Sequence, residues 1–216
     1  MSIQNIIDRA QQIEIDRRKI VAQSISRSER IKTAERSSVQ PWSFKVTPPG
    51  SLPWTASRGL IEVISTNDRS VEYEISLGST ANTSYITAYQ GGVKPISSLT
   101  SITIMSTTTS TLTLTNLPTT ASTTVLFARG DLIQPANSRY PYTVINTVTR
   151  GVSTTTTVEL NRNIITSEGI TLAGSTLRVG SSCTWRVVVS GLPTYQLVPM
   201  QRVQYTGDFE LVEKVI

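Results

Sequence analysis

From Gln40 onward the chain repeatedly alternates apolar with polar residues, which is the period of a strand with one buried face. Trp42, Phe44 and Val46, for example, alternate with Ser43, Lys45 and Thr47. Turn-forming residues interrupt these segments about every eight to twelve residues, the spacing of short antiparallel strands. The pattern predicts a mainly β fold, an antiparallel sandwich or barrel, over residues 37–216.

Residues 125–148 contain a clear example of two strands around a turn. An apolar run leads into Gly130–Asp131, turn-forming residues occupy 135–138, and a returning strand starts near Tyr140. Glycine allows the positive φ of a sharp bend. Pro141 has no amide proton, which places the returning strand at a sheet edge or a bulge. A hairpin of this kind needs further sheet on which to bury its apolar face.

A tract rich in Ser and Thr precedes that hairpin: eighteen of the twenty-eight residues in 97–124 are Ser or Thr. Disorder is one interpretation of such low complexity. However, Ile102 and Ile104 alternate with Thr, as Leu112 and Leu114 do, and Thr favours strands. We therefore predict a hairpin, whose nearly uncharged faces could lie along another subunit.

The N-terminal region, residues 1–36, has a different pattern from the body at 37–216. Between residues 2 and about 25, isoleucines and one alanine recur every three or four positions, which predicts an amphipathic α-helix. A polar, basic connector follows over 24–38. Such a narrow apolar stripe suits docking on a partner, so we predict an N-terminal α-helical arm that grips a neighbouring subunit.

Charge is concentrated in this N-terminal region. Residues 1–36 hold eight basic and five acidic side chains, a net +3, whereas the other 180 residues hold twelve and ten, a net +2. The basic residues could contact nucleic acid or an acidic protein surface. They could equally be solvated and paired with local carboxylates. No aromatic residue precedes Trp42, so this region lacks a platform for stacking bases.

The chain contains no histidine and one cysteine, Cys183. Catalytic systems of the Ser-His-Asp and Cys-His kinds are therefore excluded, as are zinc sites built on imidazole. Cys183 alternates with apolar residues on a strand, which predicts a buried structural thiol. No phosphate-binding loop or metal-ligand spacing is present, so no cofactor is expected. No apolar run is long enough to span a membrane, and the N-terminus does not have the pattern of a signal peptide.

Carboxylate pairs are the enzymatic chemistry left open, as in glycoside hydrolysis. Glutamates at solvent-facing strand positions are ordinary surface residues by default, so we expect no enzyme. The candidates for such a site are either Glu62, Glu72 and Glu74, or Asp208, Glu210 and Glu213.

Three stretches resemble tail-tube-type proteins of tailed bacteriophages. LFARGDLIQPANSRYPYTV (126–144) is similar to their Gly-Asp hairpin, QYTGDFELVEKVI (204–216) to their closing strand, and Ser26–Pro49 to their entry segment. The resemblance implies a mainly β virion protein, assembled in the host cytoplasm as a ring, commonly hexameric, around a central channel. Its partners would be copies of itself and neighbouring tail proteins, with DNA at most passing through. The tube, its initiator, the distal tail, the baseplate and the connector all remain open as its place.

The predicted subunit or partner interface combines the arm with the Thr-rich hairpin. Its residues are Ile3, Ile6, Ile7, Ala10, Ile13, Arg17, Arg18, Lys19, Arg27, Arg30, Ile102, Ile104, Leu112 and Leu114. The alternative is a β-sandwich module that adheres to carbohydrate or a receptor, for which exposed Tyr85, Tyr89 and Tyr195 would be the signal. A carboxylate-based hydrolase is the third class.

Overall fold

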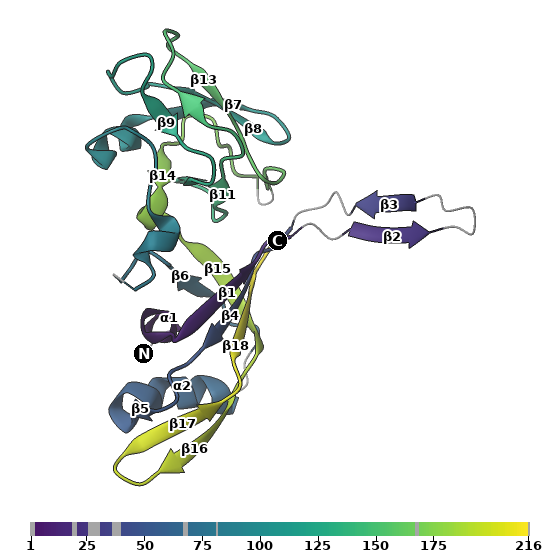
Figure 1. The fold of residues 1–216 in the computed structure, drawn as a ribbon, viewed down its shortest axis with the longest axis vertical. Coiled ribbons are helices and arrows are strands. Elements are labelled where there is room, and N and C mark those ends of the chain that lie inside the picture. The colour runs from purple at the N-terminus through teal and green to yellow at the C-terminus, as the bar shows by residue number, and fades with distance from the viewer. Residues whose placement is uncertain are drawn as a thin grey trace.

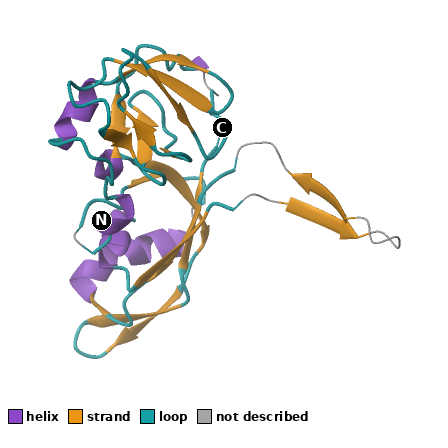
Figure 2. Ribbon diagram, turned by 45° about the horizontal axis from the view of Figure 1, so that its top comes forward, coloured by secondary structure: helices purple, strands orange, loops and turns teal. Residues whose placement is uncertain are grey.

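The computed structural model describes residues 3–18, 21–25, 31–35, 40–66, 69–80, 82–166 and 169–215. The fold is mainly β, its strands pair antiparallel, and they are arranged in two lobes from which one hairpin projects (Figures 1 and 2). The predicted mainly β class is confirmed.

The first lobe is built on a five-stranded sheet in the order β1-β4-β18-β15-β6. A smaller sheet, β16-β17-β5, and two helices complete it. The bounds of these elements are α1 Gln4–Arg9, β1 Gln12–Asp16, β4 Ser43–Thr47, β5 Leu52–Pro53, α2 Trp54–Thr66, β6 Tyr73–Ile75, β15 Trp185–Gly191, β16 Thr194–Val198, β17 Arg202–Thr206 and β18 Phe209–Glu213.

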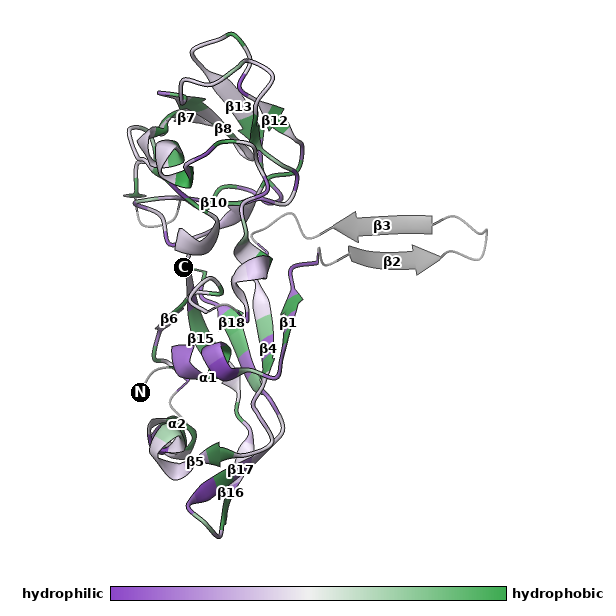
Figure 3. Ribbon diagram, turned by 60° about the vertical axis from the view of Figure 1, so that its left-hand side comes forward, coloured by the Kyte–Doolittle hydropathy of each residue, from purple (hydrophilic) through white to green (hydrophobic). Residues whose placement is uncertain are grey.

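One face of the five-stranded sheet forms the first core. Trp42, Phe44 and Trp185 are buried and in contact, with ring centroids 5.4 Å apart for the Trp pair and 5.6 Å for Phe44 and Trp185. Buried and more exposed positions alternate along β4, β15 and β18, and many apolar residues of β1, β15 and β18 are green in Figure 3. The alternation read from the sequence therefore sets which face is buried.

The second lobe lies between β6 and β15 in the sequence. It contains the sheets β13-β8-β7, β12-β9 and β11-β10-β14, which enclose a second apolar core. Its elements are η1 Ser84–Thr87, η2 Ile96–Ser101, β7 Thr103–Thr107, β8 Thr111–Thr115, β9 Val125–Phe127, β10 Leu132–Pro135, β11 Tyr142–Thr143, β12 Val148–Thr149, β13 Thr156–Glu159, β14 Leu177–Val179 and η4 Gly180–Ser182.

Two strands extend away from both lobes (Figures 1 and 2). β2 (Val21–Ile25) and β3 (Ile31–Glu35) pair with each other, from Val21 opposite Glu35 to Ile25 opposite Ile31. They lie between β1 and β4, which pair directly up to Asp16 opposite Ser43. We call β2–β3 the projecting hairpin.

The helix predicted over residues 2–25 is wrong beyond its first turns. α1 ends at Arg9, and Ala10 is extended, with ψ 138°. From Gln12 the chain is strand β1, paired with β4. Ile13 and Ile15 alternate with polar residues at period two and pack against the first core, so cross-strand pairing prevails over a spacing that also fits a helix.

The sequence of 60–64 fits either a short strand or part of a short helix from Ser57, and it lies within α2. A hairpin of 170–172 with 177–179, which Ala173-Gly174-Ser175 would turn, is wrong, because β14 pairs with β10. Two other predicted hairpins agree with the structure. The Thr-rich hairpin is confirmed as β7 paired with β8. The segment 125–148 does turn back on itself, with β9 on β12 and β10 on β11.

Candidate functional site

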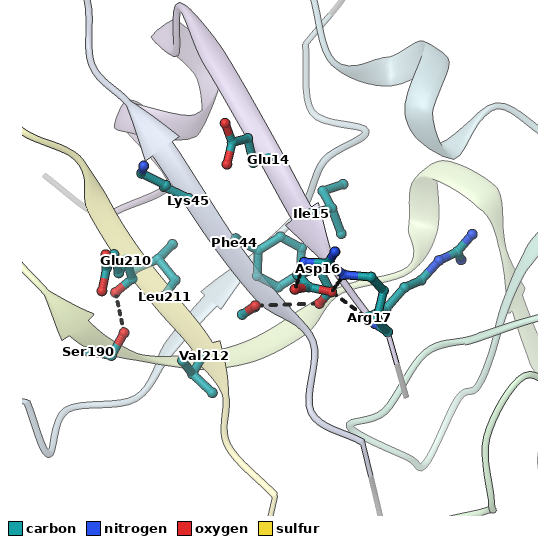
Figure 4. A pocket seen from close by; sticks show the side chains of 12 residues that line it. Glu14, Ile15, Asp16, Arg17, Phe44, Lys45, Ser190, Glu210, Leu211 and Val212 are labelled. Carbon is teal, nitrogen blue, oxygen red and sulfur yellow. Dashed lines mark hydrogen bonds and ion pairs between the residues drawn. The ribbon is translucent and has the colours of Figure 1, made fainter. Parts of the chain in front are cut away.

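Three neighbouring concavities meet at the root of the projecting hairpin, and Arg17 lines all three. The largest, about 580 Å³, lies across β1, β4, β15 and β18 (Figure 4). The other two are about 240 Å³ each. We define the hairpin root as Arg17, Gln40, Trp42, Arg129, Gly130, Thr143 and Asn161.

A buried ion pair fixes the floor of the root. Arg162, from the second lobe, makes a two-pronged contact with Glu213 at the end of β18, through N–O distances of 2.5 and 2.8 Å. Both side chains are almost fully buried, at 1% and 0% exposure. Arg162 also donates to the carbonyls of Gln40 and Pro141, at 2.7 and 2.8 Å. The backbone N–H of Trp42 donates to the same carboxylate, at 3.0 Å. The two lobes are thus joined by a dense polar contact.

Arg17 is held in a defined position at the mouth of the root. Its guanidinium lies over the Trp42 ring, 5.2 Å from the centroid, and donates to Thr143 Oγ1 at 3.2 Å. A cation over an indole face is attracted by the quadrupole of the ring. The charge is therefore oriented although the side chain is exposed.

The turn at Gly130–Asp131 brings Arg129 to the same place. Gly130 has φ 96°, which glycine adopts without the steric cost that a side chain adds. Asp131 is buried and accepts hydrogen bonds from the backbone N–H groups of Gln90 and Ala128, both at 2.8 Å. Burial raises the pKa of Asp131 above its ordinary value. The carboxylate of this Gly-Asp pair thus clamps the turn to the loop at residue 90.

The concavity between Arg17 and Arg129 is cationic. Gln40, Thr143 and Asn161 are also among its lining residues, and no carboxylate lines it in the part of the chain that is described. The acidic groups nearby in sequence or structure are engaged elsewhere. Arg18 binds Asp16 at 2.7 Å and holds the pKa of that carboxyl at about 2. Glu213 is taken by Arg162, and Asp131 by backbone N–H groups.

Most residues of the predicted interface lie elsewhere, and the apolar ones pack in or against the two cores of the chain in this conformation. Ile3, Ile6 and Ile7 are 1% exposed in the first core, and Ala10 and Ile13 pack against it. Ile102, Ile104, Leu112 and Leu114 are 0–1% exposed in the second core. Each stripe is covered by the chain itself, so it has no face left for a partner.

The basic residues of the predicted interface are only partly within the described structure. Arg17 and Arg18 are exposed at the root, whereas Lys19, Arg27 and Arg30 lie outside the described residues. Sequence reasoning missed Trp42, Arg129 and Arg162 as parts of this site. Nothing in the sequence singles out Arg162, because its partner Glu213 is 51 residues away.

The carboxylates proposed for hydrolysis are mostly paired with cations or hydroxyls. Glu72 contacts Lys214 and Arg139, and Glu74 contacts Arg186. Asp208 accepts from Thr47 Oγ1 and pairs with Lys45. Within the described residues there is no His, Cys, Asp or Glu cluster that could hold a metal ion, and no helix that could cross a membrane.

The three tyrosines do not share one kind of environment. Tyr85 is 73% exposed, whereas Tyr89 donates its hydroxyl to the Leu126 carbonyl and Tyr195 packs against the first core.

No family model matches the chain, and no curated protein matches it.

Proposed function

We propose that this chain is a structural subunit of a homo-oligomeric ring, and that the ring belongs to the tail of a bacteriophage. The projecting hairpin carries the first part of the proposal. The second part rests on the resemblance of residues 126–144, 204–216 and Ser26–Pro49 to tail-tube-type proteins.

The projecting hairpin pairs only with itself in the described backbone. β2 and β3 form a two-stranded sheet of their own, which extends away from both lobes (Figure 1). A two-stranded hairpin alone is at best marginally stable in water. Its free sheet edges are also templates for pairing with another chain. Contact with a neighbouring subunit would supply what the hairpin lacks.

Charge supports the same role. Residues 17–38 hold seven basic and two acidic side chains, so their net charge of +5 equals that of the whole chain. The remaining residues are therefore neutral in total. A cationic extension on a neutral body favours a contact between two different surfaces, the type that closes into a ring. The ring size and its place in the tail follow only from the resemblance.

The test removes the hairpin without touching the cores. Residues 19–39 are replaced by an Asn-Gly turn, which the direct pairing of Asp16 with Ser43 can accommodate. Deleting residues 1–36 instead would remove β1 and the buried Ile3, Ile6 and Ile7, and so would confuse folding with assembly.

We expect the full chain to form rings in negative-stain images and in size-exclusion chromatography, and the hairpin variant to be a folded monomer. The matched control is Val152→Ser, a change at a 95% exposed position in the second lobe, which should assemble normally. A full chain that stays monomeric at high concentration would refute the proposal, as would a hairpin variant that still forms rings.

A further inference from the structure

We propose that the hairpin root receives an acidic side chain, together with an adjacent apolar side chain, from a second copy of this chain. This inference rests on the proposed function, because it names the contact that would join two subunits.

The acidic side chain is inferred from the cationic concavity. Arg17 and Arg129 contribute two guanidinium groups, neither in an ion pair within the described structure, and Asn161 and Gln40 add amides. Guanidinium groups recognise carboxylates through paired N–H donors. Arg17 is oriented in advance by Trp42 and Thr143, so less side-chain freedom is lost when an anion binds.

The apolar neighbour is inferred from the adjoining concavity. Ile15, Trp42, Leu77, Ile86 and Leu132 line it. Arg17, Gly130 and Thr143 border both spaces, so the two adjoin. Each has a volume of about 240 Å³, which suits a single side chain.

These features favour a protein over a nucleic acid. Binding to single strands uses exposed aromatic faces, but Trp42 is only 3% exposed, with the guanidinium groups of Arg17 and Arg162 over its ring. The apolar concavity would also make no favourable contact with a phosphate group. A phosphodiester backbone therefore matches the root less well than an acidic side chain beside an apolar one does.

A second copy can supply the acidic side chain. The body outside residues 17–38 has no net charge that would repel the cationic concavity, and it carries exposed carboxylates. One is Glu62 on α2, whose carboxylate makes no ion pair among the described residues. The chain thus contains both the cationic site and acidic groups able to enter it.

The experiment compares self-association of three full-length proteins by sedimentation velocity at low and high salt. They are the wild type, the variant Arg17→Ala/Arg129→Ala, and the control Arg58→Ala/Lys94→Ala. The control removes the same charge from two exposed positions. We expect the root variant to associate at least about tenfold more weakly at low salt, and the control to match the wild type. Because the contact is ionic, the difference in association strength between the wild type and the root variant should be smaller at high salt.

Each other outcome decides a different point. If the wild type and the root variant assemble equally, this inference is overturned and the proposed ring stands. If the wild type does not self-associate, the proposed function itself fails. If the wild type binds a fluorescent single-stranded oligonucleotide and the root variant does not, the site serves phosphates and the inference is again overturned. Should the double variant misfold, Arg129→Glu alone, at an exposed position, provides the same comparison.

Discussion

At the scale of single residues, the Arg162–Glu213 pair determines how the lobes meet. A buried ion pair often adds little net stability, because desolvation offsets attraction. Removing one partner is different, since it leaves a buried charge without compensation. The consequence is a contact that fixes geometry more than it adds to the free energy of unfolding.

We predict that Glu213→Ala lowers the free energy of unfolding by about 3–5 kcal/mol, because Arg162 is left buried without its carboxylate. The control is Glu74→Ala, which removes the exposed partner of Arg186 and should cost less than about 1 kcal/mol. Urea denaturation followed by circular dichroism measures both. Equal losses for the two variants would contradict the prediction.

Cys183 was predicted to be a buried thiol, and the structure confirms it at 0% exposure. Burial raises the pKa of this thiol to about 12, so almost no thiolate is present at pH 8. We predict that a disulfide reagent such as DTNB reacts with the native chain far more slowly than with the chain in 6 M guanidinium chloride. Rapid stoichiometric labelling of the native protein would show this to be wrong.

The pKa values of Asp208 and Asp131 should lie on opposite sides of the ordinary value of 3.8. The hydrogen bond from Thr47 lowers the pKa of Asp208 in the folded chain. The ionised Asp208 therefore stabilises the fold fully above pH 3.8, and this stabilisation is lost as pH falls through the lowered pKa. Burial raises the pKa of Asp131, so its contribution instead decreases as pH rises from 3.8 through the raised value. Carbon-detected NMR titration should find Asp208 below 3.8 and Asp131 above it, and Thr47→Val should raise the Asp208 value. The opposite order would refute the assignment.

At the scale of elements, alternation located strands well where it was the sole signal. The Thr-rich hairpin, β4 and β15 follow directly from apolar residues at every second position. The N-terminal segment was misjudged because Ile3, Ile6, Ile7, Ala10 and Ile13 satisfy helical spacing, while Ile13 and Ile15 also satisfy strand spacing. Pairing with β4 decides in favour of a strand from Gln12 onward, and no local pattern in the sequence indicates that pairing.

The candidate site was harder to predict than the fold. Arg17 could be selected as an exposed basic residue, but Arg129, Gly130 and Thr143 reach it only through the way the second lobe folds back. Contacts between residues more than a hundred positions apart, such as Arg17 with Thr143, leave no local pattern. The projecting hairpin was not predicted either, because residues 21–25 continue the expected helix and residues 24–38 are polar, basic and rich in Ser, which indicates a connector.

At the scale of the whole molecule, the two lobes should unfold together. β14 of the second lobe continues through η4 into β15 of the first, and Leu132 and Ile133 of β10 belong to different cores. We predict a single calorimetric transition for the hairpin-deleted monomer, and two transitions when Glu213→Ala is added. Two well-separated transitions in the unsubstituted monomer would mean that the lobes are energetically independent.

The position of β18 affects biosynthesis. It follows every other strand in the sequence but occupies the centre of its sheet, between β4 and β15. A nascent chain on the ribosome therefore cannot close the first lobe until translation has passed residue 213. Truncated products of early termination would lack the middle strand of that sheet and, with it, the buried Phe209 and Leu211 of the first core.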